Sequence, residues 1–135
     1  MKKILLSGLI AGILLFVLAI AALYATLYLL PNLALEYYNP AFKSNETGYI
    51  LYCAHPFILS FALAWFWDRF KSQFDKAVWL RDLEFGVVYS IVATLPGMWI
   101  IYSAMAVSLE QIATWVIYGF VQATVAGIVF AKVNP

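Results

Sequence analysis

Hydrophobic and polar residues alternate along this chain in long blocks, not with the short periods of a soluble domain. Four apolar blocks are long enough to cross a bilayer, because about 20 helical residues span its hydrocarbon core. The pattern therefore predicts an all-α membrane protein, a four-transmembrane-helix bundle that forms a single domain over residues 1–135. The predicted helices cover about residues 4–30, 49–67, 83–107 and 109–131.

The breaks between the blocks support this division. Pro31 closes the first block. Residues 69–82 form a charged segment with an apolar residue at every fourth position, which predicts a helical extension or an amphipathic turn at the membrane surface. The break from Ser108 to Gln111 is so short that the last two helices must be antiparallel neighbours, and these two residues fit a capping box for the fourth helix.

Composition agrees with lipid as the solvent. Hydrophobic residues make up 65% of the chain and charged residues 11%, against about 45–50% and about 25% in soluble domains. The net charge is +1, without a basic stripe, so nucleic acid is excluded as a partner. The single cysteine excludes a disulfide within the chain.

The basic residues predict the orientation. Only Lys43 falls on one side of the four-span arrangement, and the other seven Lys and Arg residues fall on the other. The positive-inside rule then predicts cytoplasmic N and C termini in a multi-pass protein of the cell inner (plasma) membrane. The basic start also resembles a secretory signal, but the first apolar run is longer than the about 7–15 residues of a signal core, so we expect a retained helix. The seven residues are Lys2, Lys3, Arg69, Lys71, Lys76, Arg81 and Lys132.

Small residues recur every four positions in two of the predicted helices. Gly8 and Gly12 form one strip in the first helix, and Gly119, Ala123 and Gly127 form a longer strip in the fourth. Close helix packing in lipid favours such strips. They are interpreted as packing seams within the bundle, with docking of a partner protein as the alternative.

Two prolines lie inside predicted helices. Pro56 and Pro96 each remove a backbone donor, which tends to kink a helix. Pro96 precedes Gly97, so this break is the more flexible one. A static kink and a functional hinge both remain open.

His55 is the single histidine and the one readily ionisable group well inside a predicted span. A hydrogen bond to a freed carbonyl, a proton or ligand site, and a metal or haem ligand are its alternative roles. Cys53 projects about 200° away on a helix and cannot share a metal with it. The aromatic residues around it either anchor the protein at the interface or form a pocket for a lipid, a quinone or an aromatic cation. The predicted pocket residues are His55, Tyr52, Trp99, Tyr102, Tyr118 and Gln122.

Enzyme signatures are missing from the sequence: it has no paired intramembrane carboxylates, no nucleophile at usable helical spacing from a histidine, and no phosphate loop. We therefore expect a non-catalytic protein without metal or cofactor. An enzyme that takes its cofactor from a partner is a third, less favoured hypothesis. The favoured function is an accessory or structural subunit that packs against a larger membrane complex. The alternative is a small-molecule binder or transporter that acts as a homo-oligomer. The expected partners are the lipid bilayer and other membrane subunits, or a second copy of the chain.

Overall fold

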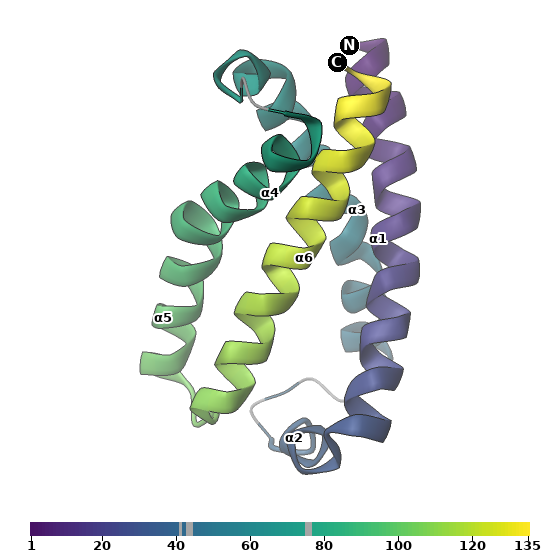
Figure 1. Ribbon diagram of the computed structural model, residues 1–135. Helices are drawn as coiled ribbons and strands as arrows, with labels where there is room; N and C mark the ends of the chain where they lie inside the picture. The colour runs from purple at the N-terminus through teal and green to yellow at the C-terminus, as the bar shows by residue number, and fades with distance from the viewer. Residues whose placement is uncertain (41, 43–44, 75–76) are drawn as a thin grey trace.

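A computed structural model of the chain describes residues 1–40, 42, 45–74 and 77–135. Four helical units dominate these residues and run up and down the molecule (Figure 1). The elements are α1 (Lys2–Leu29), α2 (Pro31–Glu36), α3 (Glu46–Phe70), the 3-10 turn η1 (Lys71–Gln73), α4 (Val78–Tyr89), the π-helical segment η2 (Ser90–Thr94), α5 (Leu95–Ala104) and α6 (Leu109–Val133).

Among the described residues, four helical stretches are long and apolar enough to span a membrane, as a multi-pass helical membrane protein requires. They are Lys2–Leu29, Glu46–Gln73, Trp79–Ala104 and Leu109–Val133. The N and C termini lie at one end of the bundle, and α2 lies at the other (Figure 1). We call these the terminal end and the α2 end.

The helix ends differ from the predicted ones because hydropathy detects the lipid-embedded part of a helix and misses the turns that project beyond it. The third unit begins at Val78, five residues before the predicted 83, and ends at Ala104 instead of 107. The charged segment after α3 continues as a 3-10 turn, as a helical extension requires, although Asp75 and Lys76 lie outside the described residues. The short helix α2 was not predicted.

Local side chains explain where α3 and α6 begin. Asn45 Oδ1 accepts a hydrogen bond from the Gly48 N–H (2.8 Å), and Ser108 Oγ accepts one from the Gln111 N–H (3.1 Å). In a complete capping box, the Gln111 side chain would also accept a hydrogen bond from the Ser108 N–H. Here another residue takes that role. Glu36 Oε2, on α2, accepts from the Ser108 N–H (3.2 Å), so α2 docks on the start of α6.

Tyr37, directly after α2, strengthens this docking. Its hydroxyl accepts hydrogen bonds from Gln111 Nε2 (2.7 Å) and Trp115 Nε1 (2.9 Å). Gln111 is buried, so its amide cannot turn to water. The first loop is thus fastened to α6 by side chains as well as by the cap.

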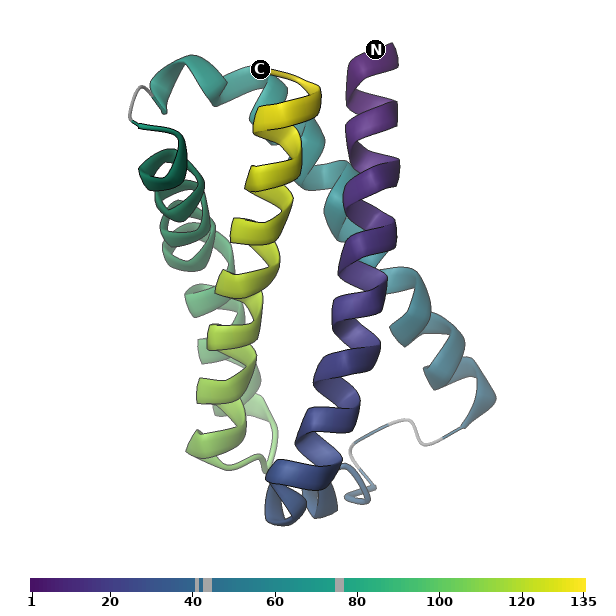
Figure 2. The same cartoon turned by 45° about the vertical axis from the view of Figure 1, so that its right-hand side comes forward.

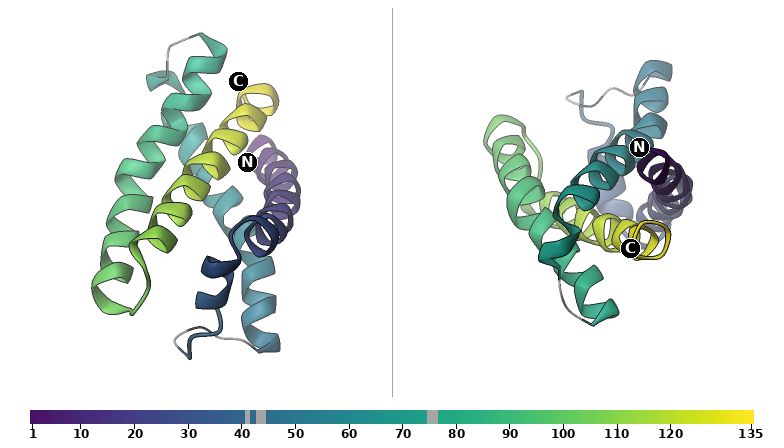
Figure 3. Two further views of the ribbon diagram at one scale, coloured as in Figure 1. Left: turned by 60° about the horizontal axis from the view of Figure 1, so that its bottom comes forward. Right: turned by 90° about the horizontal axis from the view of Figure 1, so that it is seen from above.

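The bundle is arranged around α6. One side of α6 packs against α1, and the other packs against α4, η2 and α5. Viewed along the bundle, α1 and α5 lie on opposite sides of α6 (Figure 3, right). The antiparallel α5–α6 pair follows the short connection at Ser108, as predicted.

The small-residue strips lie at contacts within the chain. A Cβ at Gly8 would lie 2.6 Å from Phe61 Cδ1 of α3, and one at Gly12 would lie 2.8 Å from Phe57 Cδ1. On α6, Ala123 is fully buried, and a Cβ at Gly127 would lie 3.3 Å from Phe85 Cδ1. The strip on α1 therefore allows α3 to pack closely against it, and the strip on α6 allows α4 to do the same.

Aromatic rings fill the terminal end of the bundle. Trp67 of α3 stacks on Phe74 (ring centroids 5.9 Å apart) and meets Phe85 of α4 edge-on (5.3 Å). Phe130 of α6 completes the cluster against Phe85 (6.2 Å). These rings join α3 to α4 at this end, where most of the buried apolar core also lies.

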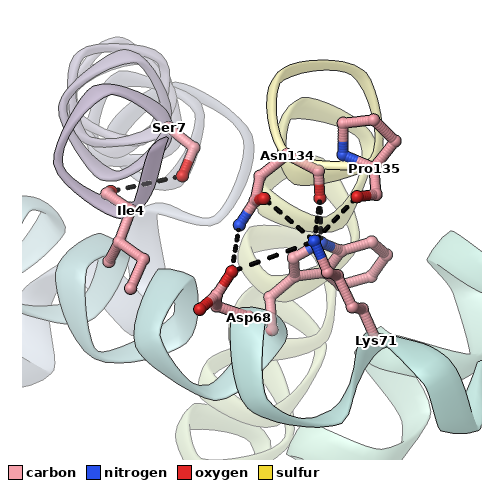
Figure 4. Close-up of polar contacts among 7 residues, drawn as sticks. Ile4, Ser7, Asp68, Lys71, Asn134 and Pro135 are labelled. Carbon is pink, nitrogen blue, oxygen red and sulfur yellow. Dashed lines mark hydrogen bonds and ion pairs between the residues drawn. The ribbon is translucent and has the colours of Figure 1, made fainter. Parts of the chain in front are cut away.

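Hydrogen bonds join the end of α3 to the end of α6 in the same region (Figure 4). The Asn134 carbonyl oxygen accepts from Trp67 Nε1 (2.9 Å), and its amide donates to Asp68 Oδ1 (2.8 Å). Lys71 Nζ donates to Asn134 Oδ1 (3.0 Å) and to the main-chain oxygen of Pro135 (2.7 Å). These hydrogen bonds hold the end of α6 against the end of α3.

Candidate functional site

Two neighbouring hollows lie between α3 and the α4–η2–α5 unit, and we refer to them together as the cleft. Its first part, the polar cavity, has a volume of about 200 Å³ and is closed on one side by α6. Its second part, the apolar groove, has a volume of about 330 Å³ and runs between α3 and the α4–η2 junction. Tyr89 borders both parts. The polar cavity is lined by His55, Tyr89, Thr94, Met98, Trp115, Tyr118, Gly119 and Gln122; the groove is lined by Leu59, Ala62, Leu63, Trp65, Phe66, Val88, Tyr89, Val92 and Ala93.

The path of α3 creates the cleft. At the terminal end, the aromatic cluster and the hydrogen bonds to Asn134 hold α3 against α4 and α6. Toward the α2 end, α3 crosses α1 and diverges from it, and its first half stands away from α5 and α6 (Figure 2). Tyr52 takes part in this arrangement, because its hydroxyl donates to the Ala19 carbonyl of α1 (3.0 Å).

The π-helical segment shapes the opposite wall. In η2 the Leu95 N–H bonds to the Ser90 carbonyl, five residues back, so the turn is wider than that of an α-helix. Thr94, at its end, lies against Gly119, where an added Cβ would lie 3.0 Å from the Thr94 Oγ1. A side chain at position 119 would therefore push this wall away from α6. Such wide turns are frequent at functional sites.

Three groups that can donate a hydrogen bond border the polar cavity without partners. Thr94 Oγ1, Tyr118 Oη and Gln122 Nε2 are buried atoms that bond to no atom of the described residues. Gln122 is 2% exposed. A buried polar group without a hydrogen bond costs a few kcal/mol, and in a membrane no bulk water relieves it. These donors are therefore ready to bond to an acceptor that enters the cavity.

The structure brings together half of the predicted pocket. His55, Tyr118 and Gln122 line the polar cavity. The Tyr52 hydroxyl bonds to α1 instead. Trp99, which is 74% exposed, and Tyr102, which is 45% exposed, are not among the lining residues.

Sequence reasoning missed the η2 and α5 wall of the cavity. Thr94 and Met98 lie at the same depth as the predicted residues, and this depth was the signal that could have found them. Gly119 was assigned to packing, and it has that role while it also lines the cavity. Trp115 was not among the predicted pocket residues, although it lines the cavity.

The lining defines the chemistry that the cleft offers. The polar cavity presents hydrogen-bonding groups and aromatic rings, and none of its lining residues is an Asp, Glu, Lys or Arg. Across the described ranges, no group of three His, Cys, Asp or Glu residues is placed to hold a metal ion. The arrangement is suited to binding a small molecule through hydrogen bonds and ring contacts. Comparisons of the chain with protein-family models, with curated proteins and with solved structures gave no match.

Proposed function

We propose that this protein is a non-catalytic membrane protein that binds an amphipathic small molecule from the bilayer in the cleft between α3 and the α4–η2–α5 unit. The observation that carries the proposal is the juxtaposition of three unpartnered buried groups, Thr94 Oγ1, Tyr118 Oη and Gln122 Nε2, with an apolar groove. A molecule with a polar head and an apolar tail satisfies both parts at once. This is the binding part of the alternative from the sequence, which was a binder or transporter that acts as a homo-oligomer, and the cleft favours binding over the accessory role.

The groove is accessible from the lipid. Trp65 on α3 is 55% exposed and Val92 on η2 is 69% exposed, and they stand on its two sides. A ligand therefore reaches the polar cavity sideways from the bilayer without passing through water. Since one chain supplies the whole lining, the binding itself requires no second copy.

A bulky residue in the groove tests the proposal. Ala62→Trp fills the groove from α3, whereas Ala113→Trp places the same side chain on an exposed position of α6 away from the cleft. Native mass spectrometry of protein purified in a mild non-ionic detergent is expected to show a small-molecule adduct on the wild type and on Ala113→Trp, and its loss in Ala62→Trp. An equal adduct on all three proteins would contradict binding in the cleft.

The accessory role remains the second candidate, supported by one exposed feature of α5. A Cβ at Gly97 would meet nothing within 4 Å, and the neighbouring Trp99 and Ile100 are exposed. An open glycine on a lipid-facing helix favours close approach of another helix. This role predicts that larger subunits co-purify from native membranes, and that Gly97→Leu releases them. Recovery of the free chain alone would contradict it.

We also propose an orientation with the terminal end in the cytoplasm, in the cell inner membrane. Six of the seven predicted cytoplasmic basic residues are described, and all belong to turns or helix ends at the terminal end. Lys76 and the single opposing residue, Lys43, lie outside the described residues. The acidic Glu36, Glu46 and Glu110 belong to the α2 end. The positive-inside rule counts the Lys and Arg residues alone, and their asymmetry is the one that it describes; the acidic residues are divided, since Asp68, Asp82 and Glu84 belong to the terminal end.

A further inference from the structure

The depth of the polar cavity restricts the head group of its ligand. Gly119 lies ten residues into α6 and His55 nine residues into α3, which corresponds to about 15 Å and about 14 Å from the α2 end. Thr94 lies ten residues before the end of α5, again about 15 Å. The hydrocarbon core is about 30 Å thick, and the first turns of α3 and α6 carry Glu46 and Glu110, so the cavity lies inside the core but nearer to the α2 end than to the terminal end. A phospholipid head group belongs at the surface and would have to leave water to reach this depth.

Charge restricts the head group further. An ion near the bilayer centre needs an opposite charge or a water-filled path. None of the residues lining the polar cavity is acidic or basic, apart from the titratable His55. A cationic head would exchange its hydration for contacts with aromatic faces alone, and an anionic head would depend on protonation of His55. A neutral head avoids both costs.

Hydrogen bonding then selects an acceptor. The Gln122 Nε2 amide is only a donor, and the Tyr118 hydroxyl has its proton uncommitted among the described residues. Carbonyl oxygens on the ligand would satisfy both. A ligand that carried only donors would leave the Gln122 amide unpartnered.

The walls and the groove indicate the shape. The rings of His55, Tyr89, Trp115 and Tyr118 surround the polar cavity, and aromatic walls favour a flat ring that stacks on them. The groove continues from Tyr89 along aliphatic side chains such as Leu59, Leu63 and Val88. A long hydrocarbon tail fits this continuation.

We infer that the ligand is a neutral lipid with a planar, carbonyl-bearing ring and a long apolar tail, which is the chemistry of a membrane quinone. This inference rests on the proposed function and specifies its ligand class. The ring lies in the polar cavity with its carbonyl oxygens toward Tyr118 and Gln122, and the tail follows the groove into the bilayer.

Binding of decylubiquinone to the full chain in phosphatidylcholine nanodiscs tests the inference. Tyr118→Phe and Gln122→Leu each remove one donor at nearly constant volume, and we expect each to weaken binding about 3- to 10-fold, the effect of one hydrogen bond. Tyr102→Phe is the matched control, because it removes the same hydroxyl outside the lining. Equal affinities for all four proteins would overturn the inference.

Competition separates failure of the ligand class from failure of the proposed function. Dioleoylglycerol is neutral and carries carbonyl groups but has no ring, and tetraphenylphosphonium is an aromatic cation. Weak competition by both supports the quinone class. Stronger displacement by dioleoylglycerol overturns the planar ring, and stronger displacement by tetraphenylphosphonium overturns the neutral head, although either result leaves small-molecule binding in place. Absence of saturable binding for all three probes, together with no adduct sensitive to Ala62→Trp, overturns the proposed function itself.

Discussion

At the scale of single residues, α6 carries two glutamines whose Nε2 atoms differ. Gln111 is 1% exposed and its Nε2 donates to Tyr37 (2.7 Å), although its Oε1 has no partner among the described residues; Gln122 is 2% exposed and its Nε2 has no such partner. Removing a buried unpartnered group relieves its desolvation penalty. We expect Gln122→Leu to stabilise the ligand-free protein by about 1–3 kcal/mol, measured by thermal unfolding in detergent.

Gln111→Leu is the control for that comparison. It makes the same change on the same helix but cuts the contact with Tyr37. Its unfolding midpoint should therefore fall. A midpoint that falls for Gln122→Leu as well would show that the Gln122 amide supports the fold and is not held ready for a ligand.

Glycines supply a second residue-scale prediction. A Cβ at Gly12 would lie 2.8 Å from Phe57 Cδ1 and 2.9 Å from Ser60 Oγ, closer than side chains normally approach. We expect Gly12→Val to destabilise the bundle by about 1–3 kcal/mol, since overpacking forces helices apart. Gly97→Ala should leave stability unchanged or slightly higher, because its Cβ meets open space. Helical content followed through a denaturant titration measures the stability of both variants. Equal losses of stability would contradict the interpretation of Gly12 as part of a packing seam.

The sequence predicted the depth of the site residues better than their direction. His55, Tyr118 and Gln122 line one cavity, but Trp99 lies at a suitable depth and points to the outside. Residue number along a helix fixes depth at about 1.5 Å per residue. The direction of a side chain also depends on how each helix is rotated against its neighbours, and a uniformly apolar helix carries little pattern to set that rotation.

At the scale of elements, the π-helical segment is what the sequence did not predict. Pro96 was expected to kink its helix, and the structure has a wide π turn, Ser90–Thr94, just before it. A turn of this kind inserts one residue into the α-helical register. Every side chain beyond it is rotated by about 100° relative to a regular helix. Met98 and Thr94 were therefore not placed at the cavity by helical periodicity.

Removing the inserted residue gives the element-scale prediction. Deletion of Ile91, which is 59% exposed and outside the cleft lining, should restore an α-helical turn and rotate the segment that follows. We expect helical content to be retained and decylubiquinone affinity to fall by at least about tenfold, because Met98 and Thr94 leave the cavity wall; circular dichroism and nanodisc binding measure the two. Unchanged affinity in a folded deletion variant would show that the π turn does not shape the site.

At the scale of the whole molecule, the number of spans followed from the sequence and their packing did not. The short connection before Ser108 placed the last two spans side by side, but nothing in the apolar blocks indicated that α6 is central or that α3 leans on α1. Long-range polar contacts decide such arrangements, among them Trp67 Nε1 to the Asn134 carbonyl and Tyr52 to the Ala19 carbonyl. Their partners lie 67 and 33 residues apart.

The orientation of the bundle is the last prediction. Its two ends are chemically unlike, since Lys3 stands at the terminal end and Glu110 at the α2 end. In a Cys53→Ser background, a membrane-impermeant maleimide should label Glu110→Cys in intact spheroplasts and label Lys3→Cys only after the membrane is permeabilised. Equal labelling of both in intact cells would indicate dual topology, and the reverse order would place the basic end outside. Since the polar cavity lies toward the α2 end while the groove extends toward the terminal end, the expected result points the tail of a bound lipid toward the cytoplasmic leaflet.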